Sequence, residues 1–178
     1  QKSFDLINED HTASNCCLAS LYSDDDPIKI KKIHSKFAKH YNVKYQNTGF
    51  NSLGKREDGI TRLGFVSSDF RIHSVAFFFF SIMLHKPKNV ELYLYSNSDI
   101  ADRFRDVIHD RSDQFTSIYN KATLDAVSTI RRDQCDVLFD LGGHTAENRL
   151  DVFASRCAPL QISWIGYAAT TGIKNMDY

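Results

Sequence analysis

The sequence has 178 residues, a length that fits one ordinary globular domain with a short appended segment. Its hydrophobic content of 42% and charged content of 25% are typical of a folded protein with a core, and they exclude a disordered or fibrous chain. The 22 basic residues balance 22 acidic residues, so no net field attracts polyanions. A general nucleic-acid-binding protein is therefore not expected.

The cysteines and the first residues bear on the cellular compartment. Cysteines at positions 16, 17, 135 and 157 show no CxxC or Cys/His ligand spacing, so we expect free thiols and no metal site. The opening residues QKSFDLINED lack the charged entry and apolar run of a secretory signal. The most apolar run, 75–84, is too short for the roughly 20 residues that span a bilayer. These features predict a cytoplasmic or nucleocytoplasmic protein without membrane contact.

Residues 1–60 differ from the rest and are predicted to form a helical segment followed by a linker. The run DDDP at 24–27 favours a helix start, because acidic side chains accept orphan amide protons and proline fits the first turn. The polar stretch NVKYQNTGFNSLGKREDG is typical of a linker, which places a boundary near Ile60. Four apolar residues recur at three- and four-residue spacing along one helix face: Ile30, Ile33, Phe37 and Tyr41.

Residues 61–178 are predicted to form an α/β domain, because short β-branched or aromatic runs alternate with helical patterns. The strands are expected at 62–67, 90–95, 114–118, 137–141 and 160–167. A helical pattern lies between each pair of successive strands. The first helix ends at residue 84, and the others cover about 99–110, 124–132 and 147–155. This spacing is that of a strand, a crossover helix and two loops, and it predicts an open parallel sheet with helices on both faces.

Four consecutive phenylalanines, Phe77 to Phe80, lie within the first of these helices. They could mark a binding box for a lipid or an aromatic cofactor. Four consecutive residues cover a whole helical turn, however, so the simpler interpretation is structural. We expect a helix that is buried on most of its sides.

In sheets of this kind, ligands bind beyond the carboxyl ends of the strands. The loop after the first strand has neither GxGxxG nor GxxxxGK, so NAD and ATP are not expected there. It does carry Asp69 and His73 near a helix start, where the backbone dipole favours an anion and keeps an imidazole neutral, as a base requires. In the alternative interpretation, Asp69 caps the helix and His73 only packs.

Two later loops are also candidates for ligand binding. Glycines after the fourth strand would let backbone approach a ligand closely, with neighbouring side chains as donors, although a tight turn with a capping threonine explains the same residues. The loop GYAATTG after the fifth strand suits a sugar or a hydroxylated acceptor, but it also suits a plain connector. The residues concerned are Gly142, Gly143, His144, Thr145, Gly166, Tyr167 and Thr171.

Three stretches together resemble a known family. They are RLGFVSSDFRIHSVAFF, LFDLGGHTAENRLDVFASRCAPLQISWIGYAATTG and the final MDY. In order and spacing over 61–178, they are similar to the catalytic region of the O-linked N-acetylglucosamine transferases, glycosyltransferase family 41, which includes the SPINDLY-type protein O-fucosyltransferases. The stretch NCCLASLYSDDDPIKIKKIHSKFAKHY resembles the helices that link tetratricopeptide repeats to that region in bacterial members.

The resemblance implies an enzyme of two Rossmann-like lobes, the GT-B arrangement, of which 61–178 is the N-terminal, acceptor-side lobe. It implies transfer of one sugar, from UDP-N-acetylglucosamine or GDP-fucose, to Ser or Thr of protein acceptors. The reaction would invert the anomeric carbon without a metal or other cofactor. A C-terminal lobe and tetratricopeptide repeats of the same full-length chain are the implied partners. Because that lobe supplies the groups for the donor diphosphate, this chain alone is expected to be inactive.

The resemblance also assigns residues. His73 matches the active-site histidine of the family. Gly143, His144 and Thr145 match the loop that approaches the donor, and Gly166, Tyr167 and Thr171 match the third motif. Position 144 is His, as in SPINDLY-like and many bacterial members, whereas animal enzymes tend to carry Tyr, so the donor stays open. The alternative function is a non-catalytic Rossmann-like protein-binding module.

Overall fold

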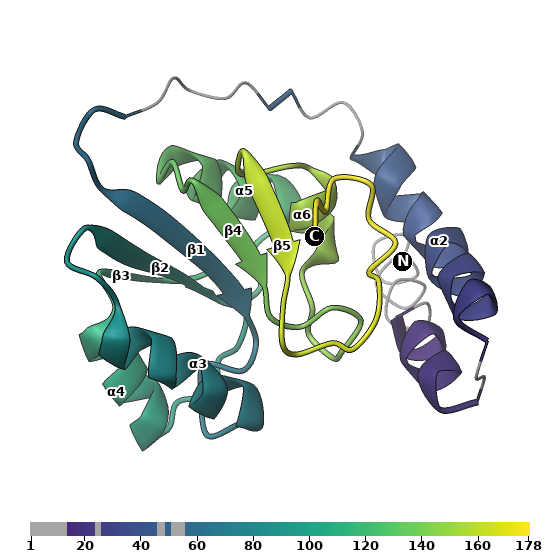
Figure 1. Ribbon diagram of the computed structural model, residues 1–178, viewed down its shortest axis with the longest axis horizontal. Helices are drawn as coiled ribbons and strands as arrows, with labels where there is room; N and C mark the ends of the chain where they lie inside the picture. Colours follow the sequence, from purple (N-terminus) through teal and green to yellow (C-terminus); the bar gives the residue numbers. More distant parts are fainter. Residues whose placement is uncertain (1–13, 24–25, 46–48, 51–55) are drawn as a thin grey trace.

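The computed structural model describes residues 14–23, 26–45, 49–50 and 56–178, and its centre is an open five-stranded sheet (Figure 1). All its strand pairs are parallel, and the strand order is β3-β2-β1-β4-β5. The predicted Rossmann-like sheet is therefore confirmed. The strands are β1 Thr61–Ser67, β2 Val90–Ser96, β3 Gln114–Ser117, β4 Val137–Asp140 and β5 Leu160–Ser163.

The strand order reverses next to β1, and this reversal marks where a ligand can enter. From β1 the chain adds β2 and then β3 on one side, and it then crosses over to add β4 and β5 on the other. Crossover helices on opposite faces leave a crevice between the loops at such a switch point. The register pairs Val66 of β1 with Asp140 of β4, so the loops that follow these two strands start at the same level.

Helices cover both faces of the sheet, as predicted. One core packs α3 (Ser74–His85) and α4 (Arg103–Arg111) onto the sheet. The other core packs α5 (Thr123–Arg132) and α6 (Leu150–Ala154) onto the opposite face (Figure 1). Each crossover therefore buries its apolar stripe against the sheet, which is what stabilises a parallel arrangement.

The N-terminal helices pack on the lobe. Residues 14–23 are helical, and α2 (Pro27–Lys44) begins at an N-cap, Asp26, whose carboxylate accepts the Ile28 amide proton at 2.9 Å. The predicted helix start is thus confirmed. Ala38 and Tyr41 of α2 share the core of α5 and α6. Part of the expected linker lies outside the described residues, and the domain boundary near Ile60 stays a prediction.

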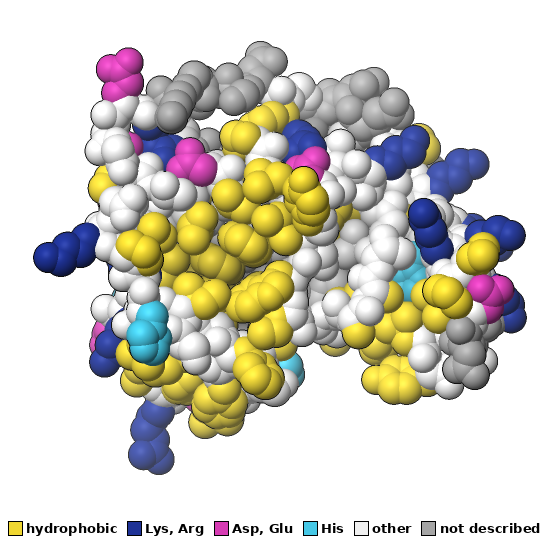
Figure 2. Space-filling model, viewed as in Figure 1, with side chains coloured by type: hydrophobic (Ala, Val, Ile, Leu, Met, Phe, Trp, Pro, Cys, Tyr) yellow, Lys and Arg dark blue, Asp and Glu magenta, His cyan; other side chains and the backbone are white. Residues whose placement is uncertain are grey.

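The expectation of a helix buried on most sides is wrong for α3. Phe79 is fully buried, but Phe77 and Phe78 are 54% and 64% exposed. The physical reason is that α3 packs one side on the sheet and touches α4 only in part, with the Phe77 ring 4.9 Å from that of Phe104. Apolar side chains gather over α3 and the adjoining sheet in Figure 2. Among the described residues, no helix is both long and apolar enough to cross a membrane.

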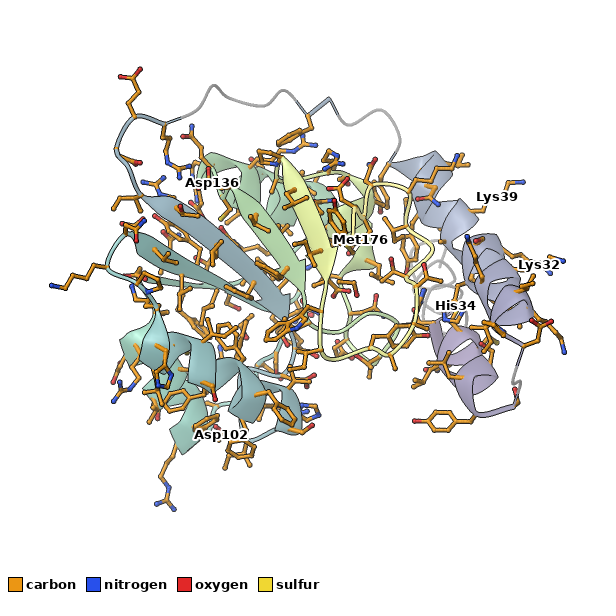
Figure 3. All side chains as sticks on the ribbon, in the orientation of Figure 1. Lys32, His34, Lys39, Asp102, Asp136 and Met176 are labelled. Carbon is orange, nitrogen blue, oxygen red and sulfur yellow. The ribbon has the colours of Figure 1, made fainter. Side chains whose placement is uncertain are left out.

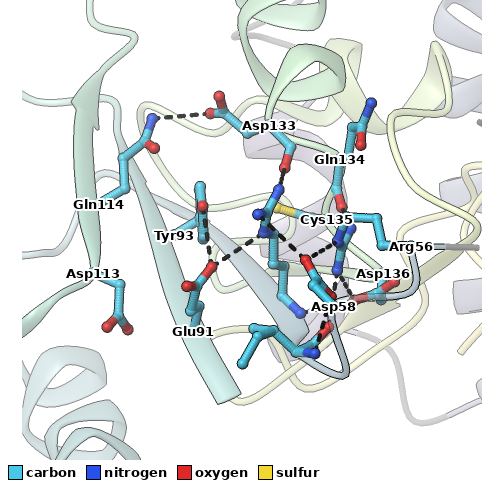
Figure 4. Close-up of polar contacts among 12 residues, drawn as sticks. Arg56, Asp58, Glu91, Tyr93, Asp113, Gln114, Asp133, Gln134, Cys135 and Asp136 are labelled. Carbon is cyan, nitrogen blue, oxygen red and sulfur yellow. Dashed lines mark hydrogen bonds and ion pairs between the residues drawn. The ribbon is translucent and has the colours of Figure 1, made fainter. Parts of the chain in front are cut away.

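A polar network ties the chain before β1 to the amino ends of the strands (Figure 4). Asp136, just before β4, accepts hydrogen bonds at 2.7 Å from both the Arg56 guanidinium and the Arg62 amide. Arg56 also donates to the Gln134 carbonyl, and Arg62 donates to Glu91 of β2 at 3.1 Å. These bonds fix one end of the sheet, so the loops at the opposite, carboxyl end are positioned from a rigid base.

Candidate functional site

A pocket of about 220 Å³ lies at the carboxyl end of the sheet, beside the switch point. The loops after β1, β2, β4 and β5 all contribute to its wall. Four of the residues singled out in the sequence, Asp69, His73, Thr145 and Gly166, line it together. The other lining residues are Ser68, Arg71, Val75, Ser98, Ile100, Ala146 and Glu147.

The loop after β1 holds Asp69 and His73 in fixed positions. The Asp69 amide donates to Ser67 Oγ at 2.9 Å, which turns the chain at the end of the strand. His73 is the N-cap of α3, and its Nδ1 accepts the Val75 amide proton at 3.3 Å. The capping role therefore belongs to His73 and not to Asp69, whose carboxylate oxygen lies 3.6 Å from the same Nδ1. The His73 side chain is 36% exposed, so it reaches both the helix and the pocket.

The capping bond determines which nitrogen of His73 carries the proton. As acceptor of the Val75 N–H, Nδ1 holds no proton, so a neutral ring carries it on Nε2. In this arrangement His73 is a hydrogen-bond donor to a ligand. A turn of the ring that lets Nδ1–H donate to Asp69 would instead leave Nε2 with a free lone pair, as a general base requires.

Arg71 adds positive charge to the pocket and was missed by the sequence analysis. Its guanidinium donates to Asp69 at 3.4 Å. Its Nε is buried and has no hydrogen-bond partner among the described residues. Arg71 lies between Asp69 and His73 in the loop after β1. Its position in that loop was the signal in the sequence that could have identified it as a pocket residue.

The glycine loop after β4 uses its backbone amides internally. Asp140, the last residue of β4, accepts the Gly142 amide at 3.1 Å and the Gly143 amide at 2.9 Å. The Thr145 amide donates to the Gly142 carbonyl at 3.2 Å. In this structure these three N–H groups point into the loop itself, so Thr145 meets the pocket through its other atoms.

Five of the residues singled out in the sequence are not on the pocket wall: Gly142, Gly143, His144, Tyr167 and Thr171. The His144 side chain is 1% exposed, and its Nε2 contacts the Thr171 carbonyl at 2.8 Å. The Tyr167 hydroxyl contacts Nε2 of His34 on α2 at 2.5 Å. His144 and Tyr167 therefore pack against the N-terminal helices, and Thr171 contacts His144. Figure 3 shows His34 on the side of α2 that faces the lobe.

Burial shifts the pKa values of two groups in these loops. It lowers the pKa of His144 to about 4, so the imidazole is neutral at physiological pH. Burial raises the pKa of Asp140 to about 6. Hydrogen bonds from the Gly142 and Gly143 amides and the Ser163 hydroxyl lower this pKa, but burial has the larger effect.

Ionisation of the buried Asp140 carboxyl group should lower the free energy of unfolding as the pH rises. Because its folded pKa lies above the unfolded value of about 3.9, its stabilising contribution is complete below about pH 4 and is lost through about pH 6. Between pH 4 and pH 7 the chain should lose on the order of 2 to 3 kcal/mol of unfolding free energy relative to Asp140→Asn. Urea unfolding of both proteins at the two pH values measures this. A difference between the two that does not change with pH would contradict the shift.

Comparison with known proteins identifies the family. The model of glycosyl transferase family 41 matches residues 22–178. The chain is 34% identical over 175 residues to "Probable UDP-N-acetylglucosamine--peptide N-acetylglucosaminyltransferase SPINDLY" of Oryza sativa subsp. japonica, covering 94% of this chain and 19% of that protein. It is 30% identical to the SEC protein of the same description from Arabidopsis thaliana, covering 86% of this chain and 17% of the relative.

A solved structure has the same fold. A Thermobaculum terrenum O-GlcNAc transferase mutant superimposes with a TM-score of 0.84 and 29% sequence identity, over 95% of this chain and 33% of that one. The chain spans about a fifth of the length of the two curated relatives. Since the family model matches most of the chain and the alignments cover the Asp69–His73 loop, the chain belongs to glycosyl transferase family 41.

Proposed function

We propose that this chain is the N-terminal, acceptor-side lobe of a protein O-glycosyltransferase. The enzyme moves one sugar from UDP-N-acetylglucosamine or GDP-fucose to Ser or Thr of protein acceptors. Membership of family 41 and the similarity to the SPINDLY and SEC proteins support the transferase class. The observation that carries the proposal is the pocket at the switch point, which joins Asp69 and His73 to Thr145 and Gly166.

The reaction we propose is a direct displacement with inversion. The acceptor hydroxyl oxygen forms a bond to the anomeric carbon, and the bond from that carbon to the donor diphosphate breaks. The hydroxyl proton passes to a base or to a donor phosphate oxygen. His73 is placed for either case: as it stands, Nε2–H donates to a ligand oxygen, and after a turn toward Asp69 it takes the proton.

The departing diphosphate needs positive charge or N–H donors, and we propose that it needs no metal ion. Arg71 supports this, because it lines the pocket and its buried Nε lacks a hydrogen-bond partner among the described residues. Fixed donors in a partly enclosed pocket stabilise developing charge without reorganising during the reaction. The remaining diphosphate contacts we assign to a C-terminal lobe.

The proposal extends to the whole protein. A C-terminal lobe closes the pocket, tetratricopeptide repeats belong to the same full-length chain, and the protein works in the cytoplasm or, in a eukaryote, also in the nucleus. His144 does not choose between the two donors directly, because its side chain faces the N-terminal helices and not the pocket. We therefore assign the selection of the donor sugar to residues on the pocket wall and to the C-terminal lobe.

We expect this chain alone to transfer no sugar. Catalysis requires the donor to be held in line with the acceptor, and most of that positioning comes from the second lobe. Purified chain should be incubated with each nucleotide sugar and a Ser/Thr-rich peptide, and the peptide mass should then be measured. A complete enzyme that carries this chain as its N-terminal lobe is the positive control.

Two results would count against the proposal. Transfer by the isolated chain would show that the second lobe is dispensable. A complete enzyme that transfers neither sugar, yet binds protein partners through this lobe, would favour the alternative of a non-catalytic binding module.

A further inference from the structure

Two histidines and one cysteine meet at a buried point between the N-terminal helices and the lobe. Cys17 lies in the helix 14–23, His34 lies on α2, and His144 lies in the loop after β4. All three are at most 1% exposed. One ligating atom from each residue lies within 4.8 Å of the ligating atoms of the other two. The sequence separates these residues widely, so only the fold brings them together.

The hydrogen bonds of the two imidazoles leave their inner nitrogens unprotonated. His34 Nδ1 lies 2.8 Å from the Ile30 carbonyl oxygen, and His144 Nε2 lies 2.8 Å from that of Thr171. A carbonyl oxygen only accepts, so each of these nitrogens carries the ring proton and donates it. The lone pairs therefore sit on His34 Nε2 and His144 Nδ1. A backbone carbonyl that fixes the tautomer in this way is the usual outer partner of a metal-binding histidine.

Two interpretations of this cluster are possible, a metal site and a set of side chains that only hydrogen-bond to one another. The role of Cys17 distinguishes between them. Without an ion, the Tyr167 hydroxyl donates a hydrogen bond to His34 Nε2 at 2.5 Å, and the Ser14 hydroxyl donates one to His144 Nδ1 at 3.3 Å. Neither bond uses the thiol. Within the part of the chain that the structure describes, no hydrogen bond reaches the Cys17 sulfur. A metal ion would use all three side chains at once.

We propose that Cys17, His34 and His144 bind a structural Zn²⁺ ion that fastens the N-terminal helices to the lobe. One thiolate and two imidazoles belong to the ligand class that zinc prefers. Ligand atoms in a tetrahedral zinc site lie about 3.3 to 3.6 Å apart, so closing the present separations requires shifts of about 1 Å. The Cys17 thiol proton is released on binding. The ion takes the His34 lone pair that now accepts from Tyr167 and the His144 lone pair that now accepts from Ser14, so both hydrogen bonds break. The phenol oxygen or a water completes four ligands.

The site would not take part in the sugar transfer. His144 points toward the helices, whereas the next residue, Thr145, lines the pocket. The ion would instead hold together the helix 14–23, α2 and the loop after β4. Structural zinc sites contribute directly to folding free energy, so zinc should stabilise this junction.

Zinc titration of the metal-free chain tests the proposal. After treatment with a chelator and its removal, the chain should bind about one Zn²⁺, and its thermal midpoint should rise with added zinc. Co²⁺ used as a spectroscopic probe should give the thiolate-to-metal band of a cysteine ligand. Cys17→Ala should abolish that band and weaken zinc binding by about 100-fold or more.

Cys16→Ala is the matched control, because Cys16 is the exposed neighbour of Cys17 in the same helix. It should bind zinc and cobalt as the unchanged chain does. His144→Gln is the second variant, since its amide keeps a donor for the Thr171 carbonyl while it removes the ligating nitrogen; circular dichroism checks that it folds. No zinc binding by the unchanged chain, or equal binding by folded Cys17→Ala or His144→Gln, would overturn the proposal.

Discussion

Replacing His73 with alanine in the complete enzyme should lower turnover by about 10²-fold or more, the scale of a positioned proton-transfer or charge-stabilising group. His73 lines the pocket, and its Nδ1 accepts the Val75 amide proton and lies 3.6 Å from an Asp69 carboxylate oxygen. Initial rates with saturating donor and acceptor measure the effect. His85→Ala is the matched control, because His85 is the exposed last residue of the same helix and should leave turnover unchanged.

The substitution His73→Gln separates the two roles that the geometry allows. Glutamine can donate a hydrogen bond but cannot act as a base at neutral pH. With Nδ1 capping α3, the Nε2–H donor role is the one that the structure favours. We therefore expect His73→Gln to be at least about tenfold faster than His73→Ala. An equal loss of turnover in both variants would indicate that His73 acts as the base. Near-full turnover of a folded His73→Ala would indicate that His73 only caps α3.

Gly143→Ala should destabilise the chain by about 3 kcal/mol or more, the range of an overpacked buried site added to left-handed strain. Gly143 has φ +54°, and a Cβ added there would lie 2.3 Å from Tyr167 Cβ and 2.4 Å from its Cγ. Both contacts are far shorter than van der Waals separation. The loop after β4 can therefore pack on the loop after β5 only because position 143 has no side chain.

Gly59→Ala isolates the contribution of the clash. Gly59 has φ +71° but no atom within 4 Å of an added Cβ, so the substitution there carries left-handed strain alone, about 1 to 2 kcal/mol. Urea unfolding of the two variants gives the comparison. Equal losses would show that backbone conformation, and not the Tyr167 contact, requires glycine at position 143.

The strands and crossover helices of the lobe could be predicted because their signals are local. Runs such as VELYLY and VLFDL are rich in β-branched, aromatic or other apolar residues, and they recur at the interval of a strand, a helix and two loops. The order of the strands is not local. That β4 pairs with β1 across the switch point depends on which crossover packs on which face, and no single stretch records it.

The candidate site was predicted in part. The loop after β1 was located because polar, titratable residues at a strand end are locally visible, and Asp69 and His73 do line one pocket. For the glycine loop the sequence left two interpretations open, close approach of the backbone to a ligand and a tight turn. In the structure Asp140 accepts two of the loop amides, which is a turn arrangement. A carboxylate two and three residues before those amides is a known turn pattern, and it was the available signal.

The surroundings of His144 could not be predicted from spacing. Its neighbours Cys17 and His34 come from helices more than 100 residues earlier, and the same is true of the His34 contact with Tyr167. Ligand spacing in a sequence reveals only sites built from one short segment. The exposure of Phe77 and Phe78 has a similar origin, because it depends on how far α4 covers α3.

A crystal structure of the complete enzyme, with an acceptor peptide and an unreactive nucleotide-sugar analogue bound, tests the central claim most directly. The claim is that the pocket after β1 and β4 is where acceptor and donor meet. We expect the acceptor hydroxyl beside the anomeric carbon in this pocket, with His73 Nε2 about 2.6 to 3.2 Å from a ligand oxygen. Both ligands bound elsewhere, with His73 touching neither, would contradict it.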